Sequence, residues 1–311
     1  MTENLKYSYM TNMWGLVVQY PQLNSWNEWY DKDYGNSVYY LDWDKILKYH
    51  VGCGITGIEL MFHMQPYIQR FFGTPQAFAD FARERGIERI TGTFSLAIGS
   101  EDRNRHPDVL AFNQKMIDFT AGLGGENINI MPASGYYGVG PLSPEQLKNA
   151  ADCFNEIGRR AADKGIDACI HSEFWCSVNK YDLERFLDMT DPRYVYFCLD
   201  TAQVSIMGFD PVKMYDQYHD RIKYFHLKDT DKLDAPDSAR FCAGAEFADD
   251  GSRWFWELGG GKIDFPGLWK LLKKYNHKGW MSIETDGTPD PLATMVLSKW
   301  YIDHVLSPIY K

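Results

Sequence analysis

The sequence lacks C-x-x-C pairs and any long apolar run, and its first residues lack a signal-peptide pattern. Its six cysteines form no C-x-x-C pair, and several lie inside apolar runs, as buried free thiols do. The first residues do not show the charged and then apolar pattern of a signal peptide. No apolar run approaches the roughly 18 residues of a membrane span. We therefore expect a cytoplasmic protein with reduced thiols and no membrane partner. The cysteines are Cys53, Cys153, Cys169, Cys176, Cys198 and Cys242.

An excess of basic charge is also absent. The 311 residues include 32 Lys and Arg against 42 Asp and Glu, which gives a formal charge of −10. Because a nucleic-acid groove needs a basic field, we expect no nucleic-acid partner. No strand is followed by a glycine-rich phosphate motif: residues 259–261 are three glycines before a helix, but no strand leads into them. A small neutral substrate remains compatible with this composition.

Strand-like and helix-like segments alternate along the whole chain. Eight short apolar runs alternate with eight helical patterns, one of which opens with the cap Ser143 and then Pro144. Eight such units in about 300 residues predict a closed (β/α)8 barrel rather than an open sheet. We predict a single α/β barrel over residues 1–311, with long loops at about 19–40 and 230–261. The predicted strands are residues 7–14, 54–61, 87–94, 127–131, 166–170, 194–200, 222–226 and 279–284.

The last four predicted strands end in metal-ligating side chains. Strands five and six deliver Glu173 and Asp200, and strands seven and eight deliver His226 and Glu284. Barrel active sites lie at the carboxyl ends of the strands, where neighbouring ends can converge on one ion. Three carboxylates and one imidazole suit Mn²⁺, Mg²⁺, Co²⁺ or Zn²⁺. We predict a divalent-metal site there, with each residue alone being compatible with an ordinary salt bridge.

The C-terminal half resembles the xylose isomerase-like barrels of the sugar phosphate isomerase/epimerase family. In the N-terminal half only the pattern around Gly57-Ile58-Glu59 is similar. The resemblance implies that Glu173, Asp200, His226 and Glu284 bind the metal, most commonly Mn²⁺. One position departs from the family, since Gln203 replaces a histidine that usually contacts substrate. The motifs are His-Ser-Glu at 171–173, Cys-Leu-Asp-Thr-Ala at 198–202, Tyr-Phe-His-Leu-Lys-Asp at 224–229, Gly-Gly-Gly-Lys-Ile-Asp-Phe at 259–265 and Gly-Trp-Met-Ser-Ile-Glu-Thr-Asp at 279–286.

Two residues near the predicted ligands are candidates for catalysis. His171 lies two residues before Glu173, on the same predicted strand face, and its imidazole could remove a proton next to a substrate carbonyl. It could equally orient a ligand, and a metal-bound glutamate could act as the base. Lys228 could neutralise an oxyanion or phosphate, or form a salt bridge with Asp229 or Glu284.

Four further residues are candidates for substrate binding. Glu59 could bind substrate hydroxyls or form a salt bridge, and Gln203 can hydrogen-bond although it cannot titrate. Trp14 and Trp175 could stack on a sugar face, although core packing is the alternative for both.

We predict a metal-dependent enzyme that abstracts a proton next to a carbonyl of a small carbohydrate. Three outcomes share that step: ketose isomerisation or epimerisation, dehydration of a keto-inositol (inosose), and aglycone elimination from a 3-oxo-glycoside. The aromatic loops, His171 and Gln203 favour the last, the reaction of a C-glycoside deglycosidase α subunit, with an oligomer and a smaller second subunit as expected partners. An AP endonuclease is a remote alternative, because that class needs more histidines and a basic groove. A non-catalytic scaffold is disfavoured, because acidic residues clustered without a metal would lower its stability.

Overall fold

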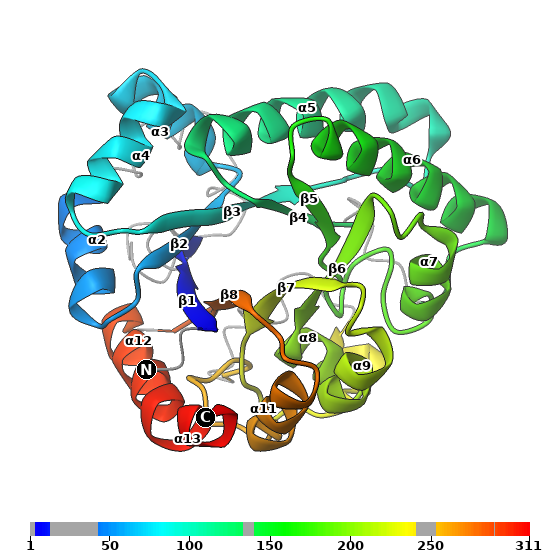
Figure 1. Cartoon of the computed structure of the whole chain (residues 1–311). Coiled ribbons are helices and arrows are strands. Elements are labelled where there is room, and N and C mark those ends of the chain that lie inside the picture. The colour runs from blue at the N-terminus through cyan, green and yellow to red at the C-terminus, as the bar shows by residue number, and fades with distance from the viewer. Residues whose placement is uncertain (1–3, 13–42, 133–139, 241–252, 289) are drawn as a thin grey trace.

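The computed structural model describes residues 4–12, 43–132, 140–240, 253–288 and 290–311. Eight parallel strands close into a barrel in sequence order, with β1 paired to β8, and helices surround it (Figure 1). The predicted (β/α)8 barrel is confirmed. Its strands are β1 (Leu5–Met10), β2 (Gly57–Met61), β3 (Arg89–Leu96), β4 (Asn127–Met131), β5 (Asp167–Ile170), β6 (Val195–Asp200), β7 (Ile222–Leu227) and β8 (Gly279–Ile283).

The helix that follows β4 begins at the cap that the sequence indicated. Ser143 accepts a hydrogen bond from the Gln146 amide, and the Gln146 side chain accepts one from the Ser143 amide. Thr74, Asp210 and Asp264 also cap helices that have proline in the first turn. The helices that alternate with the strands are α2 (Trp43–Gly52), α4 (Pro75–Glu84), α5 (His106–Leu123), α6 (Pro144–Ala162), α7 (Leu183–Met189), α9 (Pro211–Tyr218), α11 (Phe265–Lys274) and α12 (Pro291–Tyr301).

Other helices were not predicted. The helix α3 (Met64–Phe72) has no side-chain cap and carries Pro66, which masks its pattern. The helix α8 (Thr201–Ile206) starts directly at the end of β6 and is capped by Asp200. A short helix α10 (Asp237–Arg240) lies inside the long loop before α11. The final helical segment extends beyond α12 through a π-helical turn η6 (Ile302–Leu306) into α13 (Ser307–Tyr310), and a 3-10 turn η4 (Arg103–Arg105) precedes α5.

The three consecutive glycines close the loop that follows β7 onto Asp229. The Asp229 carboxylate accepts hydrogen bonds from four backbone amides, those of Thr230, Gly259, Gly261 and Ile263. A Cβ atom at Gly261 would lie 2.3 Å from Asp229 Oδ1, so the chain can approach only without a side chain. The glycines therefore let the backbone approach and hydrogen-bond this buried carboxylate.

None of the described cysteines forms a disulfide, and Cys242 lies outside the described residues. No helix among the described residues is long and apolar enough to cross a membrane. The predicted loop at residues 19–40 also lies outside the described residues, as does part of the loop at 230–261.

Candidate metal centre

The carboxyl ends of β5 to β8 bring four metal-ligating side chains together. Asp200 is the last residue of β6 and is paired in register with His226 of β7. His171 follows β5 directly, and Glu284 follows β8 directly. All four are buried. The prediction that His171 and Glu173 share a strand face is wrong, because β5 ends at Ile170 and both residues lie in the loop that follows.

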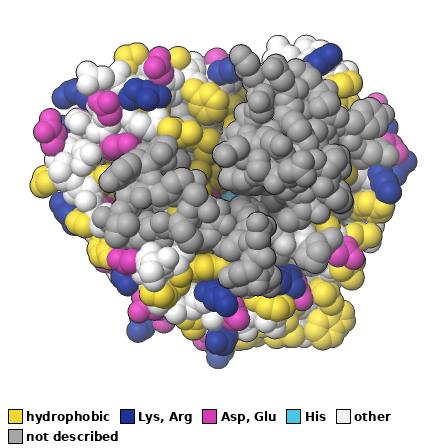
Figure 2. Space-filling model, turned by 180° about the vertical axis from the view of Figure 1, so that it is seen from behind, with side chains coloured by type: hydrophobic (Ala, Val, Ile, Leu, Met, Phe, Trp, Pro, Cys, Tyr) yellow, Lys and Arg dark blue, Asp and Glu magenta, His cyan; other side chains and the backbone are white. Residues whose placement is uncertain are grey.

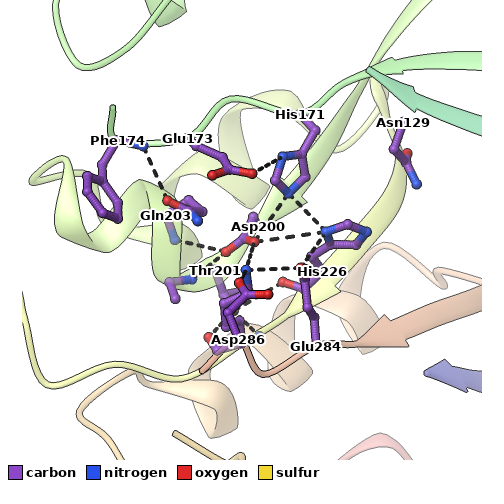
Figure 3. Close-up of polar contacts among 12 residues, drawn as sticks. Asn129, His171, Glu173, Phe174, Asp200, Thr201, Gln203, His226, Glu284 and Asp286 are labelled. Carbon is purple, nitrogen blue, oxygen red and sulfur yellow. Dashed lines mark hydrogen bonds and ion pairs between the residues drawn. The ribbon is translucent and has the colours of Figure 1, made fainter. Parts of the chain in front are cut away.

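The ligand atoms of this group converge on a small volume (Figure 3). One ligand atom from each of His171, Asp200, His226 and Glu284 can be chosen so that all lie within 4.8 Å of one another. His171 Nε2 is 3.3 Å from Asp200 Oδ2 and 2.9 Å from His226 Nδ1. His226 Nδ1 is in turn 2.7 Å from Glu284 Oε2. We call these four residues the acid–histidine cluster.

Glu173 lies at the edge of the acid–histidine cluster. Its Oε1 atom is 3.6 Å from His171 Nδ1, on the opposite side of the ring from the atom that faces Asp200. Its side chain is 11% exposed, more than that of Asp200 or Glu284. The structure therefore brings three of the four predicted ligands together with His171, and Glu173 next to them.

A buried lysine balances the negative charge of the centre. Lys228 Nζ lies 3.2 Å from Asp200 Oδ2, 3.0 Å from Glu284 Oε2 and 2.5 Å from Asp286 Oδ2. Burial opposes the charge on Lys228, but these carboxylates raise the pKa of its ammonium well above the usual value. Of the predicted salt bridges of Lys228, the one to Glu284 is present. Asp229 instead binds backbone amides.

The two histidines of the cluster have opposite electrostatic environments. Burial and the adjacent His226 lower the pKa of His171, so its imidazole is neutral. Burial also opposes a charge on His226, but Glu59 and Glu284 raise the pKa of His226 well above its usual value. Burial opposes ionisation of Asp200, yet Lys228 and His171 lower its pKa below the usual value. The neighbouring positive charge therefore favours the ionised form of Asp200.

Glu59 reaches His226 from β2, across the interior of the barrel. It is fully buried, and its Oε2 atom accepts a hydrogen bond from His226 Nε2 at 2.9 Å. Its Oε1 atom accepts one from Asn129 Nδ2 of β4 at 2.7 Å. Asn129 was not among the predicted site residues. Two asparagines alternate in the otherwise apolar strand Asn127–Met131, and that pattern was the available signal.

Asn12 and Asp286 complete the polar surroundings of Glu284 and were also missed. Asn12 Nδ2 donates to Glu284 Oε1 at 3.0 Å and to Asp286 Oδ1. Burial and the neighbouring Glu284 raise the pKa of Asp286 to about 7, although Lys228 opposes this shift. Asp286 belongs to the Glu-Thr-Asp end of the last motif, so its position in the sequence was a usable signal.

Gln203 presents a fixed donor beside the cluster. It lies in the first turn of α8, whose first amides donate to Asp200 Oδ1 at 3.0 and 2.8 Å. Gln203 Oε1 accepts a hydrogen bond from the Phe174 amide at 3.2 Å. This contact fixes the orientation of the amide group, so Nε2 points away from the Phe174 amide. The buried Nε2 atom has no hydrogen-bond partner within the described part of the chain.

An apolar wall borders the centre on one side. The Phe94 ring lies 4.9 Å from the ring of His171 and 6.1 Å from that of His226. Phe94 packs in a cluster with Met10, Leu96, Met131 and Cys176, against which Trp175 is partly buried. On the face opposite to that of Figure 1, hydrophobic side chains are exposed near the centre of the molecule (Figure 2). Trp14 lies outside the described residues.

The donor set fits a divalent cation. Ligand atoms that bind one ion at about 2.0–2.2 Å lie within roughly 4.4 Å of each other. The 4.8 Å limit of the acid–histidine cluster is therefore close to what a shared ion requires. Carboxylate and imidazole ligands suit Mn²⁺, Zn²⁺ and Co²⁺. Clustered buried acids would otherwise repel one another, and positive charge relieves that repulsion.

Curated relatives match about half of this chain. An inosose dehydratase of Clostridium beijerinckii (strain ATCC 51743 / NCIMB 8052) is 33% identical over 153 residues, which cover 48% of this chain and 50% of the relative. An inosose dehydratase of Lacticaseibacillus casei is 27% identical over 174 residues, 53% of this chain and 57% of the relative. The chain thus spans about half the length of the curated relatives it matches.

The fold has close counterparts among solved structures. A sugar phosphate isomerase/epimerase from Parabacteroides distasonis ATCC 8503 has a TM-score of 0.69 at 17% identity, covering 100% of this chain and 96% of the other. At such identity the likeness shows the fold alone. The family described as the xylose isomerase-like TIM barrel matches residues 48–301. The chain therefore belongs to the family of xylose isomerase-like TIM barrels.

Proposed function

We propose that this chain is a divalent-metal-dependent enzyme that removes a proton next to a carbonyl of a sugar-like substrate and then expels a hydroxyl group as water. A keto-inositol is the leading substrate class. The acid–histidine cluster at the carboxyl ends of β5 to β8 is the observation that carries the proposal. The match to relatives named inosose dehydratase favours dehydration over the other outcomes of the same proton abstraction.

Asp200, His226 and Glu284 would hold the metal, with Glu173 as the predicted fourth ligand. Glu173 stays in this role because it lies beside the cluster at 3.6 Å from His171 and supplies a further carboxylate. The bound ion would polarise the substrate carbonyl and so acidify the adjacent C–H bond. Mn²⁺ is our first choice and Zn²⁺ the second. A structural neighbour, an IOLI protein, was solved with a zinc atom.

His171 is the proposed base. Its pKa is lowered, so the neutral imidazole can accept a proton at physiological pH. In the dehydration, the base takes the proton next to the carbonyl, and the C–H electron pair forms an enolate. The enolate electrons then form the C=C bond as the C–O bond to the β-hydroxyl breaks, and the hydroxyl leaves as water with the proton returned by the protonated base. No oxidant or reductant is needed.

Gln203 and Lys228 would act on the substrate oxygens. The Nε2 group of Gln203 is a buried donor whose orientation is fixed by the Phe174 amide, so it suits a substrate hydroxyl or carbonyl oxygen. The Lys228 ammonium contacts three carboxylates, and in this proposal it would stabilise negative charge that develops on the substrate. Trp175 could contribute a flat apolar surface next to the apolar wall.

A second candidate is elimination of an aglycone from a 3-oxo-glycoside. The supporting observation is an apolar groove of about 320 Å³ that includes Leu96 of the apolar wall and Phe62, which packs against that wall. Its outer part contains Ile98 and Phe112, which are 43% and 37% exposed. Such a groove could accept an aromatic aglycone. If this second candidate is right, we expect the chain to act together with a smaller second subunit.

Both candidates can be tested with the same metal-loaded protein. A keto-inositol incubated with the protein should give a product lighter by one water, detected by mass spectrometry. Solvent deuterium incorporated without loss of water would indicate an isomerase or epimerase. Release of a free aglycone from a 3-oxo-glycoside, with no reaction of the keto-inositol, would favour the second candidate. No exchange and no product with any of these substrates would contradict both.

A further inference from the structure

A chain of buried polar groups supports His226 from the side away from the acid–histidine cluster. It runs from Asn129 of β4 through Glu59 of β2 to His226 of β7. The Asn129 Nδ2 to Glu59 Oε1 distance is 2.7 Å, and the Glu59 Oε2 to His226 Nε2 distance is 2.9 Å. Glu59 and His226 are fully buried, and Glu59 has no exposed surface from which to reach a substrate.

Carboxylate oxygens face both ring nitrogens of His226: Glu59 Oε2 lies against Nε2, and Glu284 Oε2 lies against Nδ1. An ionised carboxylate only accepts hydrogen bonds, so Nε2 must carry a hydrogen to bind Glu59. Asn129 donates to the other carboxylate oxygen and keeps it from rotating. While Glu59 keeps the hydrogen on Nε2, an ion bound on the cluster side would take the place of the hydrogen on Nδ1. That atom faces the cluster, at 2.7 Å from Glu284 Oε2 and 3.9 Å from Asp200 Oδ2.

We propose that Glu59 and Asn129 are positioning residues that hold His226 as the Nε2–H tautomer and aim its Nδ1 lone pair at the metal. This inference rests on the metal site of the proposed function and replaces the predicted contact of Glu59 with substrate hydroxyls. A carboxylate that accepts the hydrogen of a metal-bound imidazole increases the basicity of the ring and fixes its orientation. Burying a carboxylate is costly without such a partner.

The first test is the affinity for Zn²⁺ and Mn²⁺ of the full chain, measured by titration calorimetry on metal-free protein. Glu59→Leu should weaken binding by about 10- to 100-fold, the usual effect of losing such a carboxylate. Glu59→Gln keeps the shape and an acceptor oxygen, so it should restore much of that loss. Asn129→Leu should give a smaller loss than Glu59→Leu. Thr93→Val is the matched control, because it removes a buried hydrogen bond to Thr120 outside the centre.

The second test reads the tautomer directly. In ¹⁵N-labelled protein loaded with Zn²⁺, the His226 resonances should show a protonated Nε2 and a zinc-bound Nδ1. Glu59→Gln should keep this pattern, and Glu59→Leu should lose it or broaden it. Thermal unfolding of each metal-free variant separates a general loss of stability from a loss of metal affinity. If Glu59 had a purely structural role, its replacement would lower the stability and leave the metal affinity unchanged.

The outcomes distinguish this inference from the proposed function. If the wild-type chain binds no divalent ion, the metal site itself is contradicted. If the wild type binds the ion and folded Glu59→Leu binds it equally well, only the positioning role is overturned. Coordination through His226 Nε2 would overturn that role as well. If Glu59→Leu does not fold, the comparison of wild type with Glu59→Gln and Asn129→Leu decides in the same way.

Discussion

His171 Nε2 lies 2.9 Å from His226 Nδ1, with Asp200 Oδ2 3.3 Å from the same His171 atom. Two imidazole nitrogens at this distance either share one hydrogen or direct two lone pairs at a common positive charge. The Nε2–H of His226 already faces Glu59. The close pair therefore belongs to a site that takes up a proton or a cation. With an ion bound to His226 Nδ1, His171 Nε2 would keep the lone pair of the proposed base.

Replacing His171 with Gln should separate proton transfer from metal binding. If His171 is the base, its loss should lower kcat by about 10²- to 10⁴-fold, the usual contribution of a general base. The ion would remain, since Asp200, His226 and Glu284 are untouched. Steady-state kinetics combined with elemental analysis of the same sample measures both. Loss of the metal from His171→Gln would instead identify His171 as a ligand in place of Glu173. If Glu173 is the ligand, Glu173→Ala should contain less metal than the wild type.

Replacing Gln203 with Leu should weaken substrate binding and leave the metal in place. The change removes the fixed Nε2 donor, so KM should rise by roughly 10-fold, as expected for one lost hydrogen bond. Gln203→Glu keeps the acceptor toward the Phe174 amide but cannot donate when ionised, so it should be no better than Leu. An unchanged KM in both variants would exclude a contact between Gln203 and substrate.

Asp229→Ala should destabilise the protein without removing a metal ligand. The variant leaves the amides of Thr230, Gly259, Gly261 and Ile263 without their acceptor. We expect a loss of about 3–5 kcal/mol in the free energy of unfolding, measured by urea denaturation. Asp264→Ala, which loses an exposed helix cap to Gly267, is the control and should cost about 1 kcal/mol. Equal losses would refute the role given to the glycine loop.

The barrel could be predicted because each strand is a short apolar run bounded by helix caps and glycines. The ends that bear Asp200, His226 and Glu284 were predictable for the same reason. The hydrogen bonds that link Asn129, Glu59 and His226 were not predictable, because Glu59 contacts residues 70 and 167 positions away in the sequence. No local pattern reports such pairing across a barrel. Helix α8 was missed because Asp200 is both the last residue of β6 and the cap of α8, so no separate cap marks the start of the helix.

Acid should destabilise the protein partly through His50. Burial lowers the pKa of His50 in the folded chain to about 4, from 6.5 in the unfolded chain. The neutral ring is therefore favoured on folding, so its contribution is complete above pH 6.5 and is lost as the pH falls from 6.5 toward 4. The loss is on the order of 3 kcal/mol.

Replacing His50 with Leu tests this effect. Urea denaturation at several pH values should show a flatter dependence in His50→Leu than in the wild type between pH 6.5 and 4. Each protein is referred to its own stability at pH 8, which removes the packing effect of the substitution. Parallel curves for the two proteins would contradict the assignment.

The metal content of the purified protein tests the central claim most directly. We expect about one divalent ion per chain in the wild type, after reconstitution with Mn²⁺ or Zn²⁺ if needed, and much less in Asp200→Ala and Glu284→Ala. Thr93→Val should keep the wild-type content. A wild type that binds no stoichiometric ion after reconstitution, or Asp200→Ala and Glu284→Ala variants that retain it in full, would contradict a metal centre at the carboxyl ends of β5 to β8.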